Sequence, residues 1–183
     1  MSQRFHASQW VPYPVELVFA FFANPSNLAH MFPPALRARV EDIRMAPAPL
    51  RPVAHDPARR FLSVAAGAGS EILISFRPAR WIPTRVTWLA RIVEFTWNSH
   101  FADEQARGPF QVFRHRHAIV AEWRDGQEGT LVTDEIEFAL GYGWIGRIAE
   151  GVVKRRLRQS FAFRHRRLPE ILSIASSQAS RRG

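Results

Sequence analysis

The feature that most constrains the fold is a series of strand-like segments between Glu71 and Leu140 that no helical segment interrupts. Apolar and polar residues alternate within these segments, and turn residues separate them. Consecutive strands without crossover helices form an antiparallel sheet. The segments predicted as strands are 71–77, 84–95, 101–105, 110–123 and 130–140.

One long amphipathic helix is predicted after these strands, from Gly143 to about Ala175. Its basic residues lie mostly off the apolar stripe, and Pro169 is expected to kink or break it. A strongly bent sheet cannot bury its concave face alone, and this helix is the element long enough to cover it. The predicted stripe consists of Ile145, Ile148, Ala149, Val152, Leu157, Phe161, Leu168, Ile171 and Leu172.

The beginning of the chain completes the arrangement with strands predicted at 4–11 and 36–44 and short helices at 14–22 and 26–30. Together the segments predict an α+β helix-grip fold, in which a curved antiparallel sheet of about six to seven strands wraps around the C-terminal helix. We expect one domain over residues 1–175 and a frayed tail at 176–183.

The segment from Met45 to Gly69 has a different character, with several prolines, many alanines and no clear period. Loops of this length are uncommon in compact domains and are often functional. Two interpretations remain open for this insertion: a lid over a pocket, or a disordered excursion on the surface.

Composition excludes several classes of function. The 183 residues include no cysteine, so disulfides, thiolate chemistry and cysteine-based zinc sites are excluded. The first residues lack the apolar core of a signal peptide, and no apolar stretch is long enough to cross a bilayer. We therefore expect a cytoplasmic protein without a transmembrane segment.

The formal net charge is +9, and Lys154 is the only lysine among many arginines. The excess is interpreted as a solvated basic face or as a surface for peripheral contact with anionic groups. Arginines and aromatics are interleaved from Phe161 to Arg167. This pattern is explained better by two faces of one helix than by an RNA-binding motif. Nucleic acid is therefore not expected as a partner.

Polar residues interrupt the apolar face of the last two predicted strands. His115 and His117 share a face with Phe113, and Asp134 shares a face with Ile136. A hairpin joins these strands, so Asp134 should lie beside the two histidines. A buried carboxylate is costly unless it is paired, and an imidazole is a natural partner for it.

Three interpretations of this cluster remain open. Asp134 can fix a histidine in a purely structural role, the cluster can orient the polar head of an apolar ligand, or a histidine backed by Asp134 can act as a general base. His115, His117 and Asp134 also match a facial metal triad. No other feature of the sequence supports a metal, so neither a metal nor another cofactor is expected.

A glycine motif from Gly141 to Gly146 matches the dinucleotide fingerprint G-x-G-x-x-G. That fingerprint also requires a parallel strand after the helix and an acidic residue about 20 positions further on. Here the helix continues toward the end of the chain, and the corresponding region is rich in arginine. The glycines are therefore interpreted as turn and close-packing residues.

Three stretches carry a resemblance to known proteins: WVPYPVELVFAFFANPSNL at 10–28, FADEQARGPF at 101–110, and HRH at 115–117 followed by GTLVTD at 129–134. In this order they resemble the bacterial cyclase/dehydrase-like branch of the SRPBCC superfamily (START/polyketide cyclase/birch-pollen-allergen-like). The resemblance implies a helix-grip fold with a hydrophobic cavity between the sheet and the long helix. That superfamily includes lipid and hormone binders and aromatic polyketide cyclases.

We therefore predict that the chain binds an apolar or aromatic small molecule, lipid- or polyketide-like, in this cavity. One alternative is a cofactor-independent polyketide cyclase or dehydratase that uses a His–Asp pair, and another is a basic interaction module for RNA, ribosome or anionic membrane. No oligomeric state follows from the sequence. The predicted cavity walls are Trp88, Trp97, Phe101, Phe113 and Phe161, and the predicted polar anchors and candidate catalytic residues are His115, His117 and Asp134.

Overall fold

The seven strands form one antiparallel sheet in the order β1-β7-β6-β5-β4-β3-β2. The computed structural model describes residues 2–56, 59–61, 63–78, 83–141 and 143–180, with the backbone alone at 143–148 and 178–180. The strands are β1 Gln3–Val11, β2 Arg39–Arg44, β3 Glu71–Phe76, β4 Val86–Thr96, β5 His100–Arg107, β6 Val112–Arg124 and β7 Gln127–Ala139. The predicted α+β class and the antiparallel sheet are confirmed.

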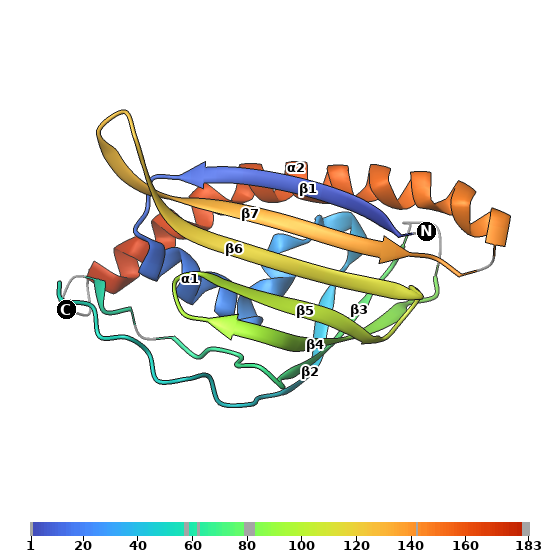
Figure 1. Ribbon diagram of the computed structural model, residues 1–183, viewed down its shortest axis with the longest axis horizontal. Coiled ribbons are helices and arrows are strands. Elements are labelled where there is room, and N and C mark those ends of the chain that lie inside the picture. The colour runs from blue at the N-terminus through green and yellow to red at the C-terminus, as the bar shows by residue number, and fades with distance from the viewer. Residues whose placement is uncertain (1, 57–58, 62, 79–82, 142, 181–183) are drawn as a thin grey trace.

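The helices lie on one side of this sheet. Two short helices, α1 Val15–Ala23 and the 3₁₀-helix η1 Pro25–Met31, follow β1, and a single 3₁₀-turn η2 Pro34–Leu36 precedes β2. The long helix α2 Gly143–Ser180 runs along the sheet, and its C-terminal part lies beside α1 (Figure 1). This is the predicted helix-grip arrangement. No helix in the described ranges has the length and apolar character needed to cross a membrane.

Helix α2 can be compared with the prediction at two points. Of the predicted kink or break at Pro169, the break does not occur: the helix continues through that residue, because Leu168 and Leu172 are fully buried on either side and hold both turns in the core. The predicted stripe also placed Val152 inside, whereas its side chain is 58% exposed and Val153 packs against the core instead. Ile145 and Ile148 lie outside the residues whose side chains are described.

The core consists of two separate apolar clusters. The larger lies between α1, the C-terminal half of α2 and the sheet, where Phe19 is fully buried. The smaller lies further along the sheet, where Phe113 and Phe138 pack against Phe161 of α2. Because the two clusters are distinct, the space between them on the concave face is available for a cavity.

The hairpin between β6 and β7 is tighter than predicted. The loop was expected over 124–129, but Arg124 pairs with Gln127, which leaves a two-residue turn at Asp125 and Gly126. Both turn residues have positive φ, 49° and 76°, as a type I′ turn requires. The Asp-Gly sequence suits that turn, so the long strands remain paired up to the tip.

Gly129 of β7 leaves room for the indole of Trp10 on β1. A Cβ at position 129 would overlap the Trp10 ring, whose Nε1 donates a hydrogen bond of 3.0 Å to the Glu122 carbonyl. We expect Gly129→Ala to lower the free energy of unfolding by about 1–3 kcal/mol, measured by urea denaturation. The control is Gly151→Ala, because a Cβ meets nothing within 4 Å there; on a helix it should be neutral or stabilising. Equal effects of both substitutions would contradict this packing argument.

The described part of the segment from Met45 to Gly69 forms no strand but is tied to the core. The amide of Ala66 donates to the carbonyl of Ala23 at the end of α1, at 2.9 Å. Arg51 lies over the ring of Trp97, 4.3 Å from its centroid, and Trp97 Nε1 donates to the Pro49 carbonyl at 2.7 Å. These contacts hold the segment against α1 and β4.

Candidate functional site

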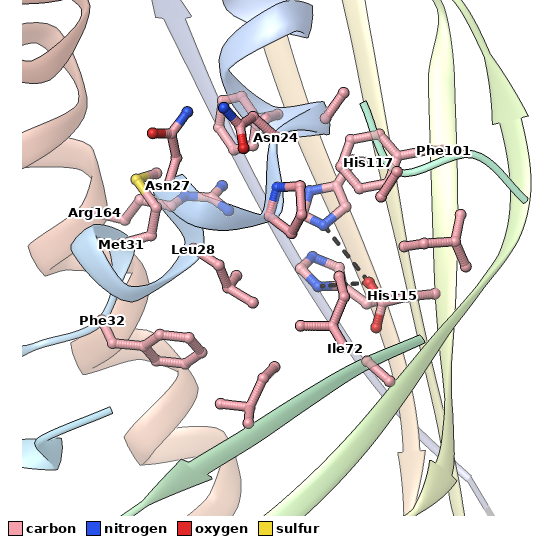
Figure 2. A pocket seen from close by; sticks show the side chains of 18 of the residues that line it. Asn24, Asn27, Leu28, Met31, Phe32, Ile72, Phe101, His115, His117 and Arg164 are labelled. Carbon is pink, nitrogen blue, oxygen red and sulfur yellow. Dashed lines mark ion pairs between the residues drawn. The ribbon is translucent and has the colours of Figure 1, made fainter. Parts of the chain in front are cut away.

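A cavity of about 210 Å³ lies between the concave face of the sheet, η1 and α2. Its walls are mostly apolar and come from both core clusters, so it occupies the space between them. Half-buried side chains of η1 and of the residue after it, among them Leu28, Met31 and Phe32, close one side, as Figure 2 shows. The other walls include Ile72, Trp88, Ala90, Ile92, Phe101, Phe113, Ile136, Leu157 and Phe161.

Polar side chains meet at one wall of this cavity because the strand register places them in adjacent rows. His117 of β6 pairs directly with Asp134 of β7 on one side and with Phe101 of β5 on the other. His115, two residues earlier on the same face, pairs with Asp103 of β5. The sheet therefore places both imidazoles between two carboxylates.

Asp134 lies behind the histidines and is completely buried. His115 Nε2 lies 2.9 Å from Asp134 Oδ1 and is hydrogen-bonded to it. His117 Nδ1 lies 2.8 Å from the same oxygen but is poorly aligned for a hydrogen bond. Asp134 therefore orients both rings from behind.

Arg164 of α2 neutralises this carboxylate. Its Nη1 donates to Asp134 Oδ1 at 2.9 Å, and its Nη2 donates to Oδ2, so the pair is bidentate. Burial by itself would raise the pKa of Asp134, but Arg164 and the two histidines outweigh burial and hold that pKa well below its usual range. The ion pair of Asp134 with Arg164 thus ties α2 to the sheet.

Asp103 lies on the cavity side of the same histidines, and its environment differs. Its Oδ1 is 4.0 Å from His115 Nδ1 and 3.9 Å from His117 Nε2. Burial raises the pKa of Asp103 to about 6. Burial, followed by the neighbouring His117, lowers the pKa of His115, which favours the neutral imidazole.

The comparisons with known proteins come from structure alone. No family model matches the chain, and no curated protein matches it in sequence. A Thermus thermophilus protein superposes with a TM-score of 0.56 at 18% identity, covering 95% of this chain and 99% of that one. The Zhui aromatase/cyclase from a Streptomyces species has a TM-score of 0.56 at 13% identity, with coverages of 100% and 96%. A Thalictrum flavum norcoclaurine synthase, in complex with dopamine and hydroxybenzaldehyde, has 0.57 at 11% identity, with coverages of 92% and 86%.

The chain has the helix-grip fold of these solved structures. These matches extend over nearly the whole of each chain, which agrees with the resemblance seen in the three sequence stretches. At such low identity the likeness shows the fold, and the roles of individual residues have to be argued from the geometry of this site.

Within the helix-grip fold, most of the predicted site residues line the cavity. Those that do are Trp88, Phe101, Phe113, His115, His117 and Phe161. Asp134 contacts both histidines from behind and does not reach the cavity surface. Trp97 lies apart from the cavity walls, because its ring packs on Phe19 and Phe95 and anchors the 45–69 segment. Of the described residues in that segment, Ala66 lines the cavity.

Sequence reasoning missed Asp103 and Arg164. Asp103 is two residues after Phe101 on a strand, so the alternation that placed Phe101 inside also places Asp103 inside. Arg164 lies three residues after Phe161 and four before Leu168, which puts it on the buried stripe of α2. In both cases the spacing along the strand or helix indicated a buried position, but the charge of the side chain argued against burial.

Proposed function

We propose that this protein binds a small aromatic molecule carrying one oxygen-containing polar group, with the ring in the apolar part of the cavity. The observation that supports this most directly is the cavity itself, whose walls are mostly apolar and which has a cluster of polar side chains on the side of the sheet. Small-molecule sites commonly have this composition, with a few placed polar groups that fix orientation. His115, His117 and Asp103 are the polar groups that the sheet contributes. The other polar residues of the lining are Asn24, Asn27, Ser160 and Arg164.

The cavity size favours a small ligand over a polycyclic one. A cavity of about 150 Å³ can hold benzene, and this one has about 210 Å³. It therefore suits roughly one substituted aromatic ring. The solved norcoclaurine synthase complex, which contains dopamine and hydroxybenzaldehyde, is consistent with one-ring ligands in this fold.

The polar group of the ligand would face His117, whose ring also stacks on Phe101 with centroids 4.4 Å apart. We expect His117→Ala to weaken binding of a phenol or an aromatic aldehyde about tenfold, the equivalent of one lost hydrogen bond. Isothermal titration with phenol, 4-hydroxybenzaldehyde and toluene measures this effect, and the toluene affinity should change little.

The control variant is His6→Ala, since His6 is exposed on β1 away from the cavity. Urea denaturation of each variant separates lost affinity from lost stability. Unchanged affinity in His117→Ala, or binding of none of the three compounds by the unaltered protein, would contradict the proposed function.

A second candidate function is a cyclase or dehydratase, because His115 has the arrangement of a general base. Its Nε2 is held by Asp134, and its Nδ1 lies on the cavity side, where it can accept a proton from a bound carbonyl compound. Dehydration would appear in mass spectrometry as a product lighter by one water, and cyclisation alone would appear as an isomer of unchanged mass with a different chromatographic retention time. His115→Gln should abolish the product but retain binding. If the product still forms in this variant, His115 is not the general base.

A further inference from the structure

The two histidines present their second nitrogens to the same point in the cavity. Asp103 Oδ1 is 4.0 Å from His115 Nδ1 and 3.9 Å from His117 Nε2, the ion pairs drawn as dashed lines in Figure 2. One potential ligand atom from each of the three residues lies within 4.8 Å of the other two. In the described part of the chain, no hydrogen bond reaches the Asp103 carboxylate.

The opposite nitrogens decide which atoms are free to bind. Because His115 Nε2 donates its proton to Asp134, its Nδ1 has a free lone pair. Asp134 Oδ1 lies 2.8 Å from His117 Nδ1 without the alignment of a hydrogen bond, and its negative charge favours the proton on that nitrogen, which leaves Nε2 free. Three electron-pair donors therefore converge, and a cation between them would satisfy all three.

We propose that Asp103, His115 and His117 bind one divalent first-row transition-metal ion at the polar wall of the cavity. Two imidazoles and a carboxylate are ligands that Zn²⁺, Co²⁺ and Fe²⁺ accept. The structure thereby changes the triad that the sequence indicated: the third ligand is Asp103, and Asp134 is the outer carboxylate that orients both rings. Carboxylates in that outer position are common behind metal-bound histidines.

The distances and charges of the site agree with this assignment. Metal–ligand bonds of about 2.0–2.2 Å place tetrahedral ligand atoms about 3.4 Å apart. The three ligand atoms, which lie within 4.8 Å of one another, therefore have to draw together, and Asp103 Oδ1 has to approach each ring by roughly 0.5 Å. Arg164 and Asp134 neutralise each other, which leaves Asp103 as the uncompensated anion beside the histidines. Three protein ligands leave a fourth position open, and it faces the cavity.

The test is a titration of the full-length, chelator-treated protein with Co²⁺ in the absence of any organic ligand, followed by visible absorption. We expect one Co²⁺ per chain, with the intense d–d bands of a tetrahedral site, and displacement by Zn²⁺. Loss of an outer carboxylate typically weakens metal binding 10–100-fold, so loss of the direct ligand in Asp103→Asn should weaken it on the order of 100-fold or more. The matched controls Asp42→Asn and His6→Gln change exposed residues and should bind as the unaltered protein does.

Circular dichroism establishes that Asp103→Asn is folded, and shifts of the His115 and His117 ring signals in NMR on addition of Zn²⁺ give a second readout in the unaltered protein. Absence of tetrahedral bands, or Co²⁺ affinity that Asp103→Asn leaves unchanged, would overturn the proposal. The metal site does not depend on the proposed aromatic ligand. Binding of phenol is measured separately in the presence of chelator, so metal binding and phenol binding can each be contradicted without the other.

Discussion

Replacing Arg164 with methionine is expected to lower the free energy of unfolding by about 3–5 kcal/mol, measured by urea denaturation in the presence of chelator. The substitution retains an unbranched apolar side chain but removes both hydrogen bonds to Asp134, which is completely buried. An uncompensated carboxylate would then remain in the core. The contact of the guanidinium with the Phe161 ring, 4.3 Å from its centroid, is lost as well.

The double variant Asp134→Asn, Arg164→Met tests whether the unpaired charge is the cause. Asparagine retains an oxygen that can accept from His115 but carries no charge, so the double variant should recover part of the stability lost by the single one. The control Arg166→Met lies on the exposed side of the same helix and should change stability by less than about 0.5 kcal/mol. A loss below about 1 kcal/mol in Arg164→Met would mean that Asp134 is not an anion in the folded protein.

The overall fold was more predictable from the sequence than the site was. The order of strands and the terminal helix follow from local periodicity, which the sequence contains in full. The exact turn at Asp125 and Gly126 and the continuation of α2 through Pro169 depend on tertiary packing. Periodicity places strands and helices, but it does not say how tightly a hairpin closes or whether buried leucines hold a helix together across a proline.

The candidate site was predictable where neighbouring strands supplied the contacts. The hairpin brings His117 beside Asp134, and alternation alone was enough to place both inside. The other two members have different requirements: Asp103 requires the register of a second neighbouring pair, β5 and β6, and Arg164 requires the rotation of α2 over the sheet, a contact between distant segments. Burial of a charged residue on an apolar stripe can be predicted only when its partner is known. The position of Arg164 on the stripe of α2 therefore did not by itself predict that its side chain is buried.

The substitution with the largest expected effect on ligand binding is Ala90→Phe. Ala90 is buried on β4 and lines the cavity. Since a cavity of about 150 Å³ can hold benzene, the added ring fits within the 210 Å³ available here and takes the place of a ligand ring. We expect the affinity for phenol or 4-hydroxybenzaldehyde to fall on the order of 100-fold, equivalent to roughly 3 kcal/mol, in the same calorimetric titration.

Stability should distinguish occupation of the cavity from damage to the fold. Filling an existing cavity with an apolar ring commonly leaves stability unchanged or raises it by about 0.5–2 kcal/mol, whereas overpacking a filled core lowers it by about 1–3 kcal/mol. Ala121→Phe makes the same chemical change on an exposed part of β6 and should leave binding intact. If Ala90→Phe is folded and binds as the unaltered protein does, the ligand lies elsewhere, and the exposed arginines of α2 become the surface to test. If it loses binding and retains stability, the space between the two core clusters is the binding site, because one added ring would then replace the ligand without disturbing either cluster.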